Sequence, residues 1–133
     1  MDIFALVKAL KLPDWQYVVF GAGPLAAHGI HATNDVDLFV TTALYQRLKV
    51  SGWSEKTTST GGLYLASGIY EADDMWEYGE YNPTVEELIA AAEVIQGVPF
   101  APLGEVLKWK RAFGRPKDRD DVLLIEEHLR TRH

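Results

Sequence analysis

The feature that most constrains the fold is a short β-forming run, Trp15–Phe20, that ends directly in the small residues Gly21–Gly23. Small residues after a strand allow the chain to turn sharply, because glycine adopts backbone conformations that a Cβ atom disfavours. An apolar segment, Leu25–His28, comes next and predicts a short helix that Gly29 ends. The sequence therefore predicts a strand, a tight turn and a short helix in direct succession.

A second β-forming run, Asp35–Val40, carries two carboxylates on either side of Val36. Side chains two positions apart on an extended strand point to the same face, so Asp35 and Asp37 point into one space. Two carboxylates on one face repel each other unless a cation lies between them, and Mg²⁺ binds carboxylates together with substrate phosphates. The pair alone is typical either of two solvated acids at a strand end or of a Mg²⁺ or Mn²⁺ site suited to phosphoryl or nucleotidyl transfer. The strand, tight turn and short helix that precede it favour the metal site, because backbone N–H groups at the start of such a helix can hold a triphosphate.

The other segments alternate between helical and extended patterns, which predicts an α+β fold with a small mixed β-sheet flanked by helices. Asp2 caps a short helix that ends before Pro13, and Thr41 or Thr42 caps a helix that ends near Val50. The remaining predicted elements are an antiparallel hairpin of Trp53–Thr58 and Leu63–Asp73, a helix over Val85–Ala92 with a Thr84–Glu87 capping box, a short edge strand with a turn within Val94–Leu103, and a C-terminal helical hairpin of Leu103–Phe113 and Lys117–Arg130.

Composition restricts the classes of function. The 133 residues, of which 47% are apolar, suffice for a single domain, residues 1–133, with a buried core. The absence of cysteine excludes disulfides and thiolate chemistry. A net charge of −6 disfavours a general nucleic-acid binder. An amino-terminal segment unlike a signal peptide or a membrane span predicts a cytoplasmic protein with no membrane partner.

Two blocks of the sequence resemble a known family. The family pattern is a strand ending in Gly-Gly, a helix ending in His-Gly, and then Arg-x-Thr-x-Asp-h-Asp-h-h, where h is apolar. The residues in that frame are Gly21, Ala22, His28, Gly29, Thr33, Asp35, Val36, Asp37, Leu38 and Phe39, and the carboxy-terminal block matches at Lys110, Arg115, Lys117, Asp118 and Asp121. The chain thus resembles the nucleotidyltransferase-like proteins of the DNA polymerase β superfamily, specifically the small bacterial group related to AbiEii toxins.

This resemblance implies a nucleotidyltransferase fold and the Mg²⁺- or Mn²⁺-dependent transfer of a nucleoside monophosphate from an NTP to an acceptor. Asp35 and Asp37 would bind the metal, and a later strand would supply a third carboxylate. Glu71 and Asp73 share one face of that strand, and Asp73 is favoured, as metal ligand and activator of the acceptor hydroxyl, because the apolar Ala72 precedes it. The implied nucleotide-binding residues are Gly21, Ala22, Gly23, His31, Thr33, Lys110, Arg115 and Lys117.

Departures from the family pattern keep a second interpretation open. Ala22 replaces the second glycine, His31 replaces the arginine, and the third acid lies in the crowded run Glu71–Asp74. Alanine is costly only where the backbone needs a positive φ, and histidine is mostly uncharged near neutral pH. The alternative is a catalytically degenerate module of the same fold that only binds a nucleotide or a protein.

The carboxy-terminal cations also have two interpretations. In the first, Lys110, Arg111, Arg115 and Lys117 form a local patch that meets a triphosphate or an RNA acceptor. In the second, Lys110 and Arg115 form ion pairs with Asp118 and Asp121 that fix the last two helices.

The roles of two aromatic residues and the partners of the protein each have more than one interpretation. Trp76 and Tyr78 either pack in the core or stack on a nucleobase. The resemblance implies an acceptor that is a tRNA end, a protein side chain or a small molecule. It also implies a toxin–antitoxin role, with an antitoxin or other protein partner or a homodimer.

Overall fold

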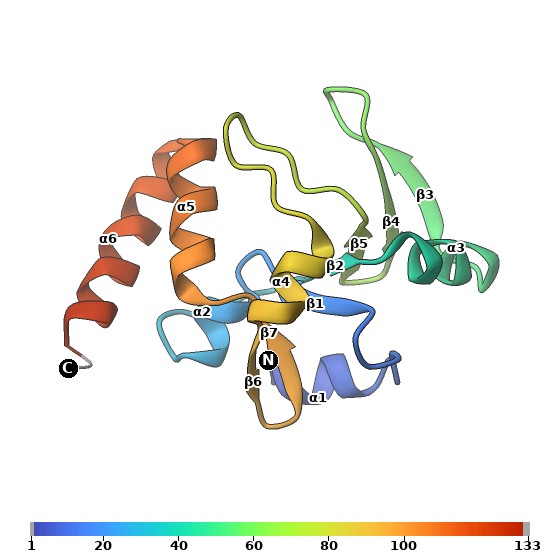
Figure 1. Ribbon diagram of the computed structural model, residues 1–133, viewed down its shortest axis with the longest axis horizontal. Helices are drawn as coiled ribbons and strands as arrows, with labels where there is room; N and C mark the ends of the chain where they lie inside the picture. Colours follow the sequence, from blue (N-terminus) through green and yellow to red (C-terminus); the bar gives the residue numbers. More distant parts are fainter. Residues whose placement is uncertain (1, 132–133) are drawn as a thin grey trace.

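Residues 2–131, which the computed structural model describes, form one seven-stranded mixed sheet with helices packed on both faces (Figure 1). The predicted α+β fold with one mixed sheet flanked by helices is confirmed, and the sheet is wider than expected. No helix in this range is long and apolar enough to pass through a membrane. The elements in chain order are α1 (Ile3–Lys8), β1 (Tyr17–Phe20), α2 (Gly23–Ala27), β2 (Val36–Val40), α3 (Thr42–Val50), β3 (Ser54–Thr57), β4 (Leu63–Ser67), β5 (Tyr70–Asp73), α4 (Val85–Ala91), β6 (Glu93–Ile95), β7 (Val98–Phe100), α5 (Leu103–Phe113) and α6 (Pro116–Arg130).

The strand order places two acidic strands side by side in the middle of the sheet. The order is β3-β4-β5-β2-β1-β7-β6, and β2 pairs antiparallel with β1 and parallel with β5. The register aligns Phe20, Asp37 and Glu71 across β1, β2 and β5. Because directly opposite residues of a sheet point to the same face, the side chains of Asp37 and Glu71 emerge together beside the end of β1.

Alternation along β1 divides the core into two apolar clusters, one on each face of the sheet. Tyr17 and Val19 pack with α1 and α3, whereas Val18 and Phe20 pack with α4, α5 and α6. Ile125 of α6 is completely buried in the second cluster, and each such side chain stabilises the fold by ~1.5–3 kcal/mol. The second cluster therefore holds α5 and α6 over the sheet face that carries Asp37 and Glu71.

The segment predicted as one strand, Leu63–Asp73, is instead two strands that reverse at Gly68. Gly68 has a φ of +59°, a left-handed conformation that glycine adopts without strain. β4 pairs antiparallel with β3, as predicted for the hairpin, and β5 turns back along β4 to pair parallel with β2. This reversal brings Glu71 next to Asp37.

The segment Val94–Leu103 also differs from the predicted single edge strand. β6 and β7 form a hairpin around Gln96 and Gly97, which both have positive φ, and β7 lies inside the sheet between β1 and β6. A proline usually confines a strand to an edge because it cannot donate to the ladder. Here β7 and β1 share a single register pair, Val19 with Phe100, which does not involve the proline at position 99.

Several helix ends lie at predicted capping residues, whereas α2 begins at Gly23, two residues before the predicted Leu25. Thr84 and Glu87 form the capping box of α4, and the Thr41 side chain accepts a backbone hydrogen bond at the start of α3. Gly114, with a φ of +66°, ends α5. Pro116 then begins α6, one residue earlier than predicted, so the predicted pair of closing helices is present.

Candidate functional site

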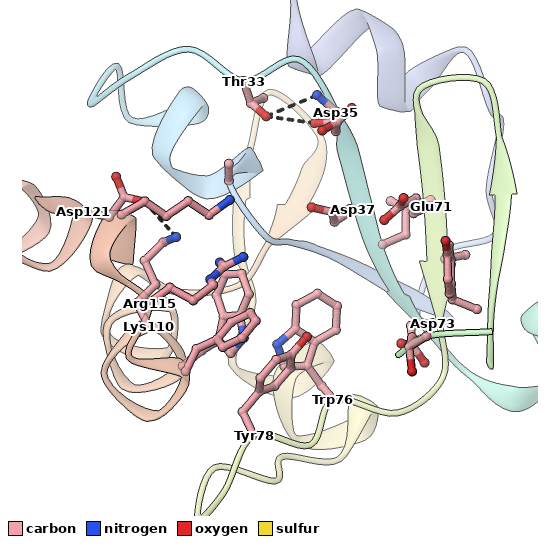
Figure 2. A pocket seen from close by; sticks show the side chains of 18 of the residues that line it. Thr33, Asp35, Asp37, Glu71, Asp73, Trp76, Tyr78, Lys110, Arg115 and Asp121 are labelled. Carbon is pink, nitrogen blue, oxygen red and sulfur yellow. Dashed lines mark hydrogen bonds and ion pairs between the residues drawn. The ribbon is translucent and has the colours of Figure 1, made fainter. Parts of the chain in front are cut away.

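A cleft of about 640 Å³ lies between the face of the sheet that carries Asp37 and the α5–α6 pair (Figure 2). Carboxylates of β2 and β5 form one wall, and cationic side chains of α5 and α6 form the facing wall. The cleft brings together most of the site residues predicted from the sequence, namely Ala22, His31, Thr33, Asp35, Asp37, Glu71, Asp73, Lys110, Arg115 and Lys117.

The carboxylate wall is centred on Asp37 and Glu71, which are opposite each other in the parallel pairing of β2 and β5. Burial raises the pKa of Asp37 to about 7, with further contributions from the charge of Glu71, a hydrogen bond shared with Glu71 and the charge of Asp35, while the charge of Lys110 lowers it. The raised pKa of Asp37 means that its surroundings do not neutralise the ionised carboxylate. The pair therefore favours a cation as its partner.

Asp73, the third acid favoured by the sequence analysis, lies two residues farther along β5 than Glu71, opposite Phe39 rather than Asp37. Its carboxylate accepts a hydrogen bond of 3.0 Å from the backbone N–H of Met75. Burial raises the pKa of Asp73 to about 6 against that hydrogen bond, and the charges of Asp74 and Glu71 raise it further. The geometry thus places Glu71 beside Asp37 and leaves Asp73 at the outer end of the same wall.

The turn after β1 contacts the carboxylate wall directly. Gly21 has a φ of +60°, and a Cβ atom at this position would overlap Oδ2 of Asp37. A Cβ atom at Gly23 would likewise overlap the side chain of Val19. Ala22 has a φ of −86°, in the right-handed region, so its Cβ is accommodated without strain, and Ala22 lines the cleft. Gly21 and Gly23 thus allow the turn to pack closely against Asp37 and Val19, where a side chain would not fit.

The cationic wall is an ion-pair network at the junction of α5 and α6. The Lys110 ammonium lies 3.4 Å from Asp118 Oδ1 and 2.8 Å from Asp121 Oδ2, and the Arg115 guanidinium donates to both oxygens of Asp118 at 2.7 and 2.9 Å. Lys110 is 4% exposed and Asp118 is fully buried. The structural pairing foreseen for these cations is therefore present, while Lys110 and Arg115 also line the cleft.

Hydrogen bonds reverse the effect of burial on Asp118. Burial alone would raise the pKa of this carboxyl, but hydrogen bonds from the Arg115 side chain and backbone, with the charges of Lys110 and Arg115, hold it below its usual value. Asp118 is therefore the ionised centre of the network. Lys117, by contrast, forms no ion pair with any residue from 2 to 131, so its ammonium is available on this wall.

The segment between α2 and β2 joins the two walls. Thr33 Oγ1 donates to the Asp35 carbonyl at 3.1 Å and accepts from the Asp35 N–H at 3.3 Å, which fixes the turn before β2. His31 lies across the cleft edge, with Nε2 3.0 Å from Asp121 Oδ1. These contacts connect the predicted metal-binding strand to α6.

Aromatic side chains line the space between the walls. Trp76 is 8% exposed and stacks on Phe20 with ring centroids 4.4 Å apart, and Trp109 meets the Phe20 ring edge-on at 5.3 Å. Trp76 therefore packs in the core, and its indole edge belongs to the cleft lining. Sequence reasoning missed Trp109 and Phe113 as lining residues, although the helical spacing of 109 and 113 would have placed them on one face of α5.

The carboxylates fit a divalent cation that is shared with a substrate. Within residues 2–131, no group of three or more histidine, aspartate or glutamate residues is arranged to hold a metal ion by itself. Mg²⁺, however, is usually bound through one or two carboxylates, with substrate phosphates and water completing its coordination. The Asp37–Glu71 pair has this oxygen-donor chemistry, and Asp35 lies close enough for its charge to act on Asp37.

The comparisons with known proteins bear on the fold. No protein-family model and no curated protein matches the chain. The crystal structure of ANT(2″)-Ia in complex with adenylyl-2″-tobramycin superposes with a TM-score of 0.52 and 18% sequence identity, over 96% of this chain and 85% of that chain. The fold is similar to that of a nucleotidyltransferase. The narrower resemblance to the group related to AbiEii toxins stays a prediction.

Proposed function

We propose that the protein is a nucleotidyltransferase that transfers a nucleoside monophosphate from a metal-bound NTP to an acceptor hydroxyl. The observation that carries the proposal is the in-register pair of Asp37 and Glu71 on one wall of a cleft. The facing wall carries the cations of Lys110, Arg115 and Lys117 beside two aspartates of α6. A metal–triphosphate complex has the complementary arrangement, because its cation meets the carboxylates while its phosphates meet the ammonium and guanidinium groups.

Asp37 and Glu71 are the carboxylates assigned to Mg²⁺ or Mn²⁺ in this proposal, and Asp35 adds negative charge beside Asp37. Glu71 takes the place that the sequence analysis assigned to Asp73, because the register puts Glu71, and not Asp73, opposite Asp37. A divalent ion bound there supplies charge neutralisation at the reacting phosphate. Asp73 then serves the acceptor, since a half-buried carboxyl with a pKa of about 6 is suited to take a proton from a hydroxyl near neutral pH.

The phosphates are assigned to the other side of the cleft. Lys110 and Arg115 are held in place by their ion pairs, and Lys117 has its charge uncompensated among the described side chains. Preorganised cations of this kind stabilise charge that develops on a leaving pyrophosphate without reorganisation during the reaction. Ala22 and Thr33 line the cleft nearby and offer backbone and hydroxyl groups to the same phosphates.

The acceptor side of the cleft favours a molecule that is not a polyanion. No lysine or arginine lies between Lys56 and Lys108, a stretch that contains β4, β5, α4 and the connection between β5 and α4. Glu71, Asp73 and Asp74 belong to this stretch. An RNA acceptor would lack the cationic contacts that dominate nucleic-acid affinity. We therefore favour a neutral or cationic hydroxyl-bearing small molecule, and the neighbour crystallised with adenylyl-2″-tobramycin is in accord with that choice.

Calorimetry of Mg²⁺-dependent NTP binding tests the proposal. Wild type should bind at least one of ATP, CTP, GTP and UTP only when Mg²⁺ is present, and Asp37→Asn and Glu71→Gln should each abolish that binding. Asp73→Asn should retain it, because Asp73 is assigned to the acceptor. Glu77→Gln removes one exposed negative charge outside the cleft and is the matched control.

The same experiment distinguishes the alternatives. Metal-independent NTP binding that survives Asp37→Asn would favour the catalytically degenerate module. A wild type that binds none of the four nucleotides would contradict the proposal.

A further inference from the structure

His31 is clamped between two hydrogen-bond acceptors. Its Nδ1 lies 2.7 Å from the carbonyl oxygen of Ala32, and its Nε2 lies 3.0 Å from Oδ1 of Asp121. A carbonyl oxygen can only accept, so Nδ1 must carry a proton. A neutral imidazole has one N–H, which would leave the lone pair of Nε2 facing a carboxylate oxygen.

The contact between His31 and Asp121 is an ion pair when the histidine is protonated. Asp121 Oδ2 also lies 2.8 Å from the Lys110 ammonium. Both ring nitrogens of His31 can donate to these two oxygen acceptors at once only in the imidazolium form. The two hydrogen bonds, to Ala32 and to Asp121, therefore exist together only while His31 is protonated.

The His31–Asp121 contact joins α6 to the segment before β2. Within residues 2–131 it is the only ion pair that connects α6 to an element other than α5, since every other ion pair of α6 joins it to α5 or lies within the last two helices. It also extends the cationic wall into an alternating chain of charges. The chain consists of His31, Asp121, Lys110, Asp118 and Arg115.

We infer that His31 is a positioning residue that couples nucleotide binding to pH. Protonated, it shares the charge of Asp121 with Lys110, so the five-member chain has three cations and two carboxylates and leaves Lys110 able to attract phosphate. When His31 is neutral, Asp121 forms an ion pair with Lys110 alone. The wall then has one positive charge fewer and loses its ion pair with the segment before β2. This inference rests on the proposed function and adds regulation to the same site.

The surroundings of His31 decide how it must be tested. Asp120 and Lys117 of α6, Lys110 of α5 and Asp35 of the segment before β2 are the other charged groups of this part of the cleft. Asp37 on the opposite wall also titrates near neutrality. A pH profile of wild type alone therefore mixes two effects, and variants that differ only at position 31 separate them.

The first experiment observes the ring directly. Long-range ¹H–¹⁵N NMR of the ligand-free protein reports which ring nitrogens carry protons as the pH rises. We expect both nitrogens to be protonated at low pH and the neutral form to keep its proton on Nδ1, which donates to Ala32. A neutral form protonated on Nε2 would overturn the inference.

The second experiment measures Mg·ATP affinity at pH 6.0 and pH 8.0. The ratio of the two affinities should be about fivefold larger in wild type than in His31→Arg, which keeps its charge at both pH values. His31→Gln should bind weakly at both. His128→Gln removes another histidine, outside the cleft, and should keep the wild-type ratio.

Equal ratios in wild type and His31→Arg would overturn the inference and leave the proposed function standing. Where wild type binds another of the four nucleotides instead of ATP, the same ratios are measured with that nucleotide. A wild type that binds none of ATP, CTP, GTP and UTP with Mg²⁺ at either pH would overturn both the inference and the proposed function.

Discussion

At the scale of single residues, the site depends on how closely the backbone of the turn after β1 approaches the carboxylate wall. Gly21 combines a left-handed conformation with a position at which any Cβ would meet Asp37. Ala22, one residue later, has an ordinary helical conformation. The departure from Gly-Gly to Gly-Ala therefore falls at the position that tolerates it and does not argue for a degenerate site.

Gly21→Ala should cost more stability than backbone strain alone explains. Gly29→Ala is the matched control, because Gly29 also has a positive φ, of +71°, but nothing lies within 4 Å of the place that its Cβ atom would take. We expect Gly29→Ala to cost ~1–2 kcal/mol and Gly21→Ala at least ~3 kcal/mol in urea unfolding. Gly21→Ala should also abolish Mg·NTP binding. Equal losses of unfolding free energy in the two variants would show that the close approach of Gly21 to Asp37 does not affect stability.

At the scale of elements, the α5–α6 junction is organised by one buried carboxylate. Replacing Asp118 leaves the buried Lys110 with only Asp121 as a partner. We expect Asp118→Asn to lower the free energy of unfolding at pH 7 by ~3–5 kcal/mol, as for other broken buried ion pairs. Asp120→Asn, an exposed change on the same helix, should alter it by no more than ~0.5 kcal/mol.

The stabilisation by Asp118 should depend on pH in one direction. The pKa of Asp118 is depressed in the folded protein, so its contribution is fully present above the ordinary aspartate value of ~3.8 and is lost as the pH falls through the folded value. The difference in unfolding free energy between wild type and Asp118→Asn should therefore be constant from pH 5 to 8 and shrink below pH 4. A difference that grew on acidification would contradict the assigned hydrogen bonds.

The capping box of α4 offers an element-scale test that should leave the site untouched. Thr84 and Glu87 satisfy each other's backbone N–H groups at the start of α4, and neither residue lines the cleft. Thr84→Ala should cost ~1 kcal/mol of stability. Calorimetry should show unchanged Mg·NTP affinity. Weakened binding would mean that α4 contributes to the cleft through the Trp76 segment.

Elements with strong local signals were predictable from the sequence, and their pairing was not. The strand predicted over Asp35–Val40, the α4 capping box and the helix end at Gly114 depend on a few neighbouring residues, and each is present, with β2 beginning one residue later at Val36. Gly68 also reverses the chain locally, but only tertiary pairing with β2 decides that β5 runs parallel and sets Glu71 opposite Asp37. His31 and Asp121 are 90 residues apart, and no local pattern indicates such a contact.

At the scale of the whole molecule, the two walls of the cleft come from separate segments of the chain. β2 and β5 carry the carboxylates, whereas α5 and α6 carry the cations and pack on the same sheet face through the second apolar cluster (Figure 1). A ligand that bridges the walls should therefore stabilise both together.

Hydrogen–deuterium exchange tests this coupling. Saturating Mg·NTP should slow amide exchange in β2 and β5 and equally in α5 and α6. α1 packs on the other face of the sheet and should exchange unchanged. Protection confined to the sheet would show that the nucleotide does not reach the cationic wall.

The aromatic lining also makes the molecule its own optical reporter. Trp76 and Trp109 border the cleft, while the other two tryptophans, Trp15 and Trp53, lie away from it. Indole emission responds to changes in local polarity and to ring stacking, so an unlabelled sample should change its intrinsic fluorescence as the cleft fills. With Trp15 and Trp53 replaced by phenylalanine, that signal would come from the cleft alone, and candidate acceptors could be screened by titration in a cuvette before any product is known.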